Sequence, residues 1–142
     1  MSSSAGRSDP RRDRRVILLD TNVFLPPIGG PGLVQRAEEL AEGAEVTVPS
    51  AVLRELDRLD SAGVAGAALG RELAGRCRVL VTPGRGDAAI LRAALAHRAI
   101  LVTADRELQA RARSAGVEVA GPRDRGRLVL LRGRAKRSPA NG

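Results

Sequence analysis

Short apolar runs alternate with amphipathic segments along the middle of the chain. The runs are three or four residues long and rich in Val, Ile and Leu, and Thr47 and Glu118 are the two polar residues within them. They occupy residues 16–19, 46–48, 79–81, 100–102 and 117–119. Such runs are typical of strands that are buried on both faces. Between them, apolar residues recur at helical spacing and predict helices over 33–43, 50–60, 64–75, from Asp87 onward, and over 105–115. Strands that alternate with helices over short connections favour an α/β fold with a parallel sheet covered on both faces.

Proline, glycine and serine mark where these elements begin and end. Three Pro and three Gly within residues 25–32 predict a loop, and Gly43 is expected to end the first helix. Ser50 is the expected N-cap of the helix that follows the second strand. The helix over 64–75 is rich in Ala and Gly, so it is expected to pack closely against a neighbour. The apolar run 127–131 predicts a further strand at an edge of the sheet.

The net charge of +8 is concentrated at the two ends of the 142-residue chain. Residues 1–15 hold five Arg and two Asp, residues 121–142 hold six Arg, one Lys and one Asp, and residues 16–120 hold twelve Arg and thirteen acidic residues. The sequence therefore predicts a flexible basic arm (1–15), one compact domain (16–120) and a basic C-terminal segment (121–142). Basic ends on a near-neutral body point to a polyanionic partner such as nucleic acid, although basic termini are also often simply solvated.

The composition excludes several kinds of site. Cys77 is the sole cysteine, which excludes an internal disulfide and a cysteine-rich zinc site. Phe24 is the sole aromatic residue, so an aromatic stacking platform for single-stranded nucleic acid is excluded as well. No apolar run approaches the roughly 20 residues of a membrane span, and the N-terminus lacks the apolar core of a signal peptide. We therefore expect a cytoplasmic protein with no membrane partner.

Three carboxylates follow apolar runs at equivalent places. Asp20 ends the first run, Asp87 opens the helix after the third, and Asp105 comes just after the fourth. A parallel sheet brings the ends of its strands to one edge, where ligands bind in α/β folds. Each Asp, taken alone, is also a common turn or N-cap residue. Together they predict a site for a hard divalent cation such as Mg²⁺ or Mn²⁺, with Thr21 and Asn22 holding Asp20 in place.

The helix over 50–60 offers a fourth acid, and the sequence leaves its identity open. Glu55 lies at the border of the apolar stripe and Asp60 lies near its middle, so periodicity alone does not choose between them. Charged residues on such a helix usually form its solvated face. The residues interpreted in this way are Arg54, Asp57 and Arg58.

Four segments of the chain resemble those of the PIN-domain ribonucleases, in the same order and at similar spacing. They are VILLDTNVF (16–24), VPSAVLRELDRL (48–59), GRGDAAILRAAL (84–95) and ILVTADREL (100–108). The resemblance implies an α/β/α sandwich with a central, mainly parallel sheet. It also implies an RNA endonuclease that depends on Mg²⁺ or Mn²⁺. The acidic quartet that it implies is Asp20, Glu55, Asp87 and Asp105, supported by Asn22 and Thr103.

Within that family, segment 48–59 and the ending RLVLLRGR (127–134) are most similar to the archaeal and eukaryotic group that processes small-subunit ribosomal RNA. The chain departs from that group at Ala88 and Ala104, where an acidic residue and Asn are usual, and this weakens the case for a second metal ion. Toxin-type PIN proteins, which act with an antitoxin, are the nearest relatives in size. A catalytically silent RNA-binding protein that keeps the fold is the remaining alternative.

The resemblance also implies a mechanism and partners. Asp20, Asp87 and Asp105 would bind the cation, and Glu55 would bind it or orient the attacking water. The RNA backbone would be held by the basic C-terminal segment, through Arg123, Arg125, Arg127, Arg132, Arg134, Lys136 and Arg137. The sequence leaves open the RNA target, the number of metal ions and the oligomeric state, for which the family makes a homodimer one alternative.

Overall fold

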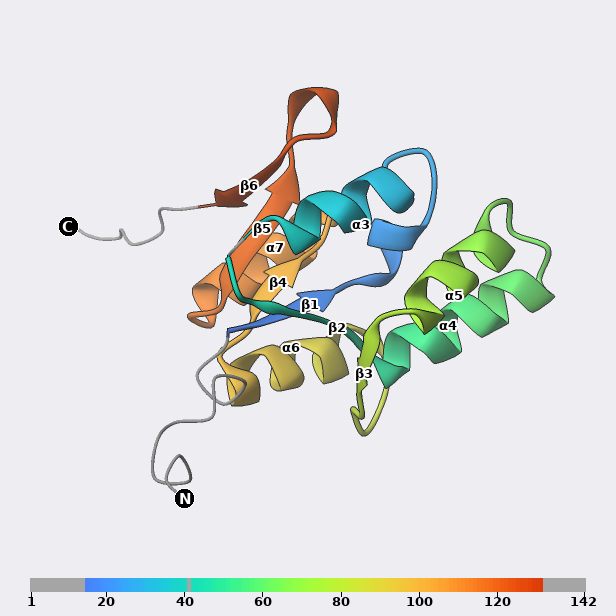
Figure 1. Ribbon diagram of the computed structural model, residues 1–142. Coiled ribbons are helices and arrows are strands. Elements are labelled where there is room, and N and C mark those ends of the chain that lie inside the picture. Colours follow the sequence, from blue (N-terminus) through green and yellow to red (C-terminus); the bar gives the residue numbers. More distant parts are fainter. Residues whose placement is uncertain (1–14, 41, 132–142) are drawn as a thin grey trace, which may run out of the picture.

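The computed structural model describes residues 15–40 and 42–131, which form a six-stranded sheet (Figure 1). The strands lie in the order β3-β2-β1-β4-β5-β6. Their bounds are β1 Val16–Leu19, β2 Glu45–Pro49, β3 Arg78–Leu80, β4 Ile100–Val102, β5 Glu118–Pro122 and β6 Leu128–Leu131. The first five strands are parallel to one another, and β6 pairs antiparallel with β5. The predicted α/β fold with a mainly parallel sheet is therefore confirmed.

Helices cover both faces of this sheet. Their bounds are η1 Thr21–Phe24, α3 Pro31–Glu38, α4 Ser50–Ser61, α5 Ala67–Gly75, α6 Gly86–His97, α7 Arg106–Ser114 and η2 Asp124–Gly126. Figure 1 shows α3 over one face and α6 over the opposite face, and α7 packs on β5. The helices α4 and α5 lie side by side, and both contact η1 just beyond the end of β1. The three layers of an α/β/α sandwich are thus present.

The strand β1 lies at the centre of the core, because β2 and β4 flank it. Ile17, Leu18 and Leu19 are all fully buried. Burial on both faces explains why this strand is continuously apolar instead of alternating between apolar and polar residues. Asp20 follows directly, so this central, buried strand delivers a carboxylate to the carboxyl edge.

Two elements end elsewhere than the sequence predicts. The first helix begins at Pro31, because proline suits the first helical position. It ends at Glu38 rather than at Gly43, and the N–H of Leu40 then bonds three residues back, to the carbonyl oxygen of Ala37, as in a 3₁₀ turn. The third strand covers Arg78–Leu80, and Val81, which was expected to end it, is 82% exposed. The remaining strands lie within a few residues of their predicted positions.

The start of α4 is capped differently from the prediction. Pro49 is extended, with φ −64° and ψ 141°, and takes the N-cap position, so Ser50 is already helical. Ser50 Oγ instead accepts a 2.8 Å hydrogen bond from the N–H of Thr82. Thr82 Oγ1 in turn accepts a 3.1 Å hydrogen bond from the N–H of Ala51. The predicted N-cap is therefore wrong, and a threonine 31 positions away satisfies the helix start and ties α4 to the β3–α6 connection.

The described chain enters and leaves the sheet at its amino edge. Val16, the first residue of β1, pairs with the first residue of β2. The edge strand predicted at 127–131 is confirmed as β6, and its last residue, Leu131, pairs with Val119 near the start of β5. The β5–β6 connection, which contains η2, consequently lies at the carboxyl edge. Over the described residues, no helix combines the length and the apolar character needed to cross a membrane.

Candidate active site

A hydrogen-bonded network surrounds Asp20 at the carboxyl edge of the sheet. Its N–H donates a 3.0 Å hydrogen bond to the carbonyl oxygen of Val102 at the end of β4. Its side-chain oxygen Oδ1 accepts a 2.8 Å hydrogen bond from the N–H of Thr21 and so caps η1. The residue is only 6% exposed. A largely buried carboxylate is thus held in one orientation at the end of the central strand.

Thr103 and Asn22 bind the second carboxylate oxygen of Asp20. Thr103 Oγ1 donates a 2.6 Å hydrogen bond to Oδ2 of Asp20, and Asn22 Nδ2 donates one of 3.2 Å to the same oxygen. Asn22 Oδ1 accepts a 2.9 Å hydrogen bond from the N–H of Ala104. These bonds join the end of β1 to the end of β4. The two polar residues that the family resemblance marks as supporting positions therefore contact Asp20 directly.

Asp105 is the N-cap of α7. Its Oδ1 accepts hydrogen bonds of 2.9 Å and 3.2 Å from the N–H groups of Glu107 and Leu108. Its own N–H donates a 3.1 Å hydrogen bond to Thr103 Oγ1. The Thr103 hydroxyl therefore donates to Asp20 and accepts from the main chain of Asp105, and so links two of the four predicted acids.

A cavity of about 590 Å³ brings all four predicted acids together. Asp20 and Asp105 line it from the ends of β1 and β4, Asp87 lines it from the first turn of α6, and Glu55 lines it from α4. Among the described residues, neither Asp57 nor Asp60 lines this cavity. Of the acids on α4, it is therefore Glu55 that lines the cavity with the other three.

Burial raises the pKa of Asp20 above its ordinary value, and the neighbouring carboxylates of Asp87 and Asp105 raise it further. The hydrogen bonds from Thr103 and from the N–H of Thr21 act in the opposite direction and lower it. Asp20 is thus close enough to two other acids to feel their charge in a partly desolvated site. A cation bound beside it would favour its ionised form.

Two of the acids have arginine partners. Glu55 accepts hydrogen bonds of 3.2 Å and 2.7 Å from Nε and Nη2 of Arg58, and these bonds hold the pKa of Glu55 below its usual value. Asp87 Oδ2 lies 3.8 Å from Nη1 of Arg111 in α7. The ion pair with Arg58 therefore turns the Glu55 carboxylate toward its own helix.

The donor set has the chemistry of a Mg²⁺ or Mn²⁺ site, because four carboxylates line one cavity and hard cations prefer oxygen ligands. In their present side-chain conformations, no three Asp, Glu, His or Cys side chains of the described chain stand close enough together to hold a metal ion. Glu55 has to leave Arg58 before it can join the other acids. The residues therefore fit the cation in the kind of ligand that they offer.

Three arginines that sequence reasoning left out of the site line the same cavity. They are Arg54, Arg58 and Arg85. Arg54 and Arg58 are exposed, as predicted for a solvated face, but the part of that face on which they lie also borders the cavity. Positions 54, 55 and 58 share one side of a helix, so the sequence signals that Arg54 and Arg58 accompany Glu55, but only packing shows that this side faces a cavity.

The predicted RNA contacts of the C-terminal segment are only partly within the described residues. Arg123 and Arg127 are exposed and flank η2, at the carboxyl edge of the sheet. The side chain of Arg125 is not described. Four of the predicted contacts lie outside the described residues: Arg132, Arg134, Lys136 and Arg137. Residues 1–14 of the predicted basic arm lie outside them as well. None of the described ones lines the acidic cavity.

Comparison with known proteins identifies the family. Residues 17–125 match a family model described as a PIN like domain. This match covers most of the chain, so the protein belongs to the family of PIN-like domains. The family that the four sequence segments pointed to is therefore confirmed.

Solved structures with this fold agree with the family. The structure of the PIN domain endonuclease Utp24 is similar with a TM-score of 0.62 and 18% sequence identity, over 87% of this chain and 94% of that chain. A domain of a functionally unknown protein from Methanocaldococcus jannaschii DSM 2661 is similar with a TM-score of 0.54 and 18% identity, over 89% and 97%. At this identity the likeness shows a shared fold. None of the curated protein sequences matches the chain.

Proposed function

We propose that this protein is an endoribonuclease that hydrolyses RNA phosphodiester bonds with the help of Mg²⁺ or Mn²⁺. The observation that supports it most is the convergence of Asp20, Glu55, Asp87 and Asp105 on one cavity at the carboxyl edge of the sheet. The PIN-like family and the likeness to a PIN domain endonuclease support the same reaction class.

Each acid has a role that follows from its surroundings. Asp20 and Asp105 are held by hydrogen bonds and would keep two carboxylates in place with little loss of conformational freedom on binding. Asp87 lies across from them on α6. The Glu55 side chain is exposed enough to leave its ion pair with Arg58 and turn toward the other acids. There it would orient the attacking water or accept its proton. A bound divalent cation would lower the pKa of a water molecule and offset the charge that builds on the phosphoryl oxygens.

Ribosomal RNA is the first substrate class to test. The segment 48–59 and the ending 127–134 resemble the group of PIN proteins that processes small-subunit ribosomal RNA. The chain has a single aromatic residue, Phe24, which is buried. We therefore propose that the target is recognised through its shape and phosphates rather than by stacking of bases.

The test is cleavage of a structured ribosomal RNA fragment with Mn²⁺, with Mg²⁺ and with chelator. Asp20→Asn is expected to lower the rate by about 100-fold or more. The matched control is Asp124→Asn, which removes an exposed carboxylate at the same edge of the sheet outside the cavity. Cleavage that persists in Asp20→Asn would mean a contaminant or a different site, and no cleavage of several RNAs by either protein would favour a silent binding protein.

A further inference from the structure

Three arginines share the cavity with the four acids, and they differ in what already engages them. A cavity lined only by carboxylates would repel a phosphate, so a site for a nucleic acid strand needs cations beside the acids. Arg54, Arg58 and Arg85 provide them. Which of the three can bind a ligand depends on their present contacts.

Arg54 is occupied by the fold itself. Its Nη2 donates hydrogen bonds of 3.3 Å to the carbonyl oxygen of Thr82 and 2.6 Å to that of Gly84. These bonds hold the connection between β3 and α6 against α4. Arg54 is therefore a positioning residue for the loop that carries Arg85.

Arg85 is held out from the protein at the start of α6. It is the N-cap residue and is exposed. Its neighbours Gly84 and Gly86 have φ values of 82° and 75°, which side chains other than glycine rarely adopt. The backbone around Arg85 is thus shaped by two glycines, and in the described part of the chain its guanidinium makes no hydrogen bond or ion pair.

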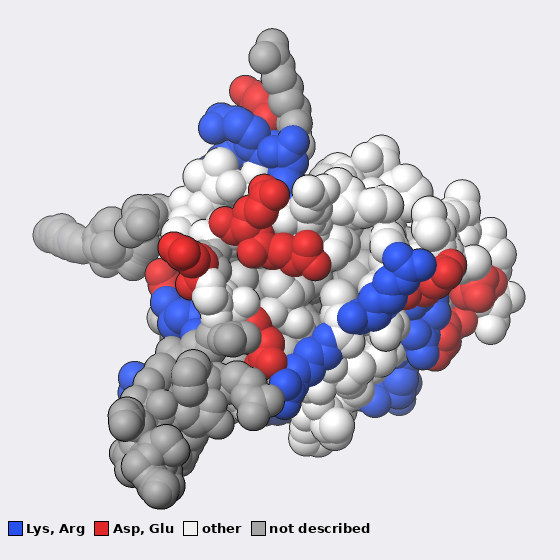
Figure 2. All heavy atoms as spheres, viewed as in Figure 1, with Lys and Arg blue, Asp and Glu red and all other residues white. Residues whose placement is uncertain are grey.

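Several arginines of the described chain are already ion-paired, whereas others, such as Arg36 and Arg106, are exposed and, like Arg85, have no side-chain partner there. Figure 2 shows one face of the molecule, where blue basic side chains lie next to red acidic ones. The ion pairs away from the cavity include Arg71 with Asp57, Arg76 with Glu72, and Arg78 with Glu45. Arg85 differs from these paired arginines because it lines the cavity beside the four acids.

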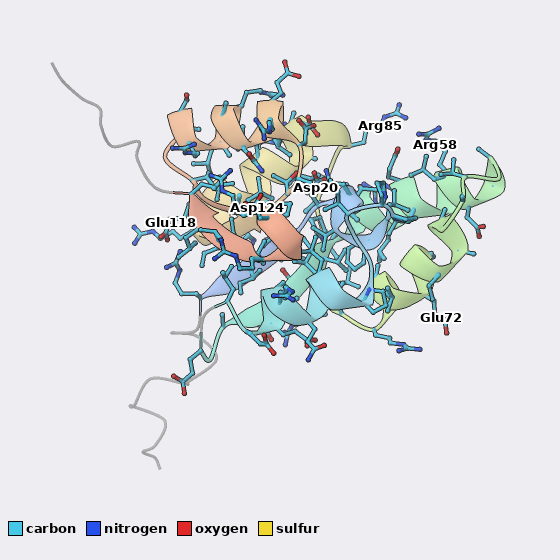
Figure 3. All side chains as sticks on the ribbon, turned by 90° about the horizontal axis from the view of Figure 1, so that it is seen from above. Asp20, Arg58, Glu72, Arg85, Glu118 and Asp124 are labelled. Carbon is cyan, nitrogen blue, oxygen red and sulfur yellow. The ribbon has the colours of Figure 1, made fainter. Side chains whose placement is uncertain are left out.

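Arg58 can change partners at little cost. Its ion pair with Glu55 joins side chains that are 64% and 41% exposed, and exposed pairs of this kind contribute little to stability. Figure 3 shows Arg58 and Arg85 on the same side of the molecule, projecting from α4 and from the start of α6. A phosphate that takes Arg58 would release Glu55 toward the other acids.

We propose that Arg85 and Arg58 form a phosphate-binding subsite for the backbone of the nucleic acid strand at the mouth of the acidic cavity. The ligand is the strand that the acids would cleave, so this inference rests on the proposed function. Arg85 binds one backbone phosphate directly. Arg58 leaves Glu55 and binds a second backbone phosphate. One guanidinium group can donate two parallel hydrogen bonds to the oxygens of one phosphate, so each of the two arginines can hold a phosphate by itself.

The experiment measures binding of a fluorescent oligo(U) strand of roughly 12 nucleotides to the full chain by anisotropy, over a range of salt concentrations. It is done in chelator, so that no strand is cut. Arg85→Ala is expected to weaken binding by about 3- to 10-fold at low salt. It should also reduce the slope of log Kd against log salt by about 0.7, which corresponds to one phosphate contact with a single strand. Arg85→Lys should keep most of the slope. In the double variant, Arg85→Ala with Arg58→Ala, the slope should fall by about 1.4, which corresponds to two phosphate contacts.

The matched control is Arg36→Ala, which removes the same charge from an exposed position on α3, on the other face of the sheet. The subsite is contradicted if Arg85→Ala leaves the slope unchanged, or if Arg36→Ala reduces it equally. Because chelator suppresses cleavage, the outcome is separate from the proposed reaction. A smaller salt slope in Arg85→Ala, together with no metal-dependent cleavage by the native protein, would support the subsite and contradict the proposed nuclease activity. Metal-dependent cleavage by the native protein, together with an unchanged slope in Arg85→Ala, would support the nuclease activity and contradict the subsite.

Discussion

Thr103 Oγ1 lies 2.6 Å from Oδ2 of Asp20, although the two residues are 83 positions apart in the sequence. The same hydroxyl accepts a hydrogen bond of 3.1 Å from the N–H of Asp105. Asp20 and Thr103 follow the last paired residues of two neighbouring strands, since Leu19 of β1 pairs with Val102 of β4. One buried hydroxyl group therefore sets the positions of two acids.

Replacing this threonine should affect both stability and pH dependence. Thr103→Val keeps the shape of the side chain but removes a donor to a largely buried carboxylate, which should cost about 1–3 kcal/mol in the free energy of unfolding. Since the hydrogen bond from Thr103 lowers the pKa of Asp20, its loss should move the acidic limb of the cleavage profile to higher pH. Urea unfolding and rates over a pH series measure the two effects.

The control for this prediction is Thr47→Val. Thr47 is also buried in the sheet, and its Oγ1 donates a 3.0 Å hydrogen bond to the carbonyl oxygen of Ile17, away from the acids. It should lower stability by a similar amount and leave the pH profile in place. Equal shifts of the profile in both variants would show that the hydroxyl of Thr103 has no special effect on Asp20.

The stability of the protein should fall as the pH rises through the pKa of Asp20. Burial raises that pKa in the folded state above its value in the unfolded chain. Between the two values the folded protein binds more protons than the unfolded one, so rising pH favours unfolding. Asp20→Asn cannot ionise and should lack this component. Urea unfolding from about pH 4 to about pH 8 tests it, and the idea fails if Asp20→Asn and the exposed Asp124→Asn show the same dependence.

The two acids of α4 between which periodicity did not choose should behave differently. Glu55→Gln removes a carboxylate that lines the cavity and should lower the cleavage rate by about 100-fold or more. Asp60→Asn alters an exposed residue on the same helix and should leave the rate within about twofold of wild type. Single-turnover rates with saturating Mn²⁺ distinguish them. A larger loss of rate in Asp60→Asn than in Glu55→Gln would show that Asp60, and not Glu55, has this role.

Close packing behind the site should make Gly70 sensitive to substitution. A Cβ at Gly70 of α5 would lie 2.6 Å from the carbonyl oxygen of Phe24 in η1. Gly70→Ala should therefore lower the free energy of unfolding by about 1–3 kcal/mol, in spite of the higher helix propensity of alanine. At Gly75 of the same helix, the Cβ would meet only the flexible end of Arg71, at 3.1 Å. Gly75→Ala should be neutral or slightly stabilising, and equal losses in urea unfolding would contradict the packing argument.

The sheet was predictable because its strands are buried on both faces. Runs such as 16–19 and 100–102 are apolar without interruption, and the structure places strands at these very residues. Asp20 and Asp105 were found by the same local signal, since Asp20 follows such a run directly and Asp105 comes three positions after one. The Ala- and Gly-rich helix expected to pack closely does so at Gly70.

The ends of helices were harder to predict, because their hydrogen bonds can come from distant segments. The start of α4 depends on Thr82, which no pattern around Ser50 reveals. The first helix ends five residues before Gly43, where the N–H of Leu40 bonds to Ala37 in a 3₁₀ turn that the pattern of residues 33–43 does not reveal. Local residue preferences are weak where another segment supplies the partner.

By itself the sequence determined the order of strands and helices, the family, and the three aspartates that end up at one edge of the sheet. These follow from local hydrophobic patterning and from the geometry of parallel strands. Periodicity left Glu55 and Asp60 open, and the family resemblance implied Glu55, which lines the cavity in the structure. Only the tertiary structure decided that Arg58 and Arg85 stand beside it, and that β6 carries the chain back to the amino edge. Periodicity places a residue on its own element, whereas the face of that element which meets a cavity depends on how separate elements pack against one another.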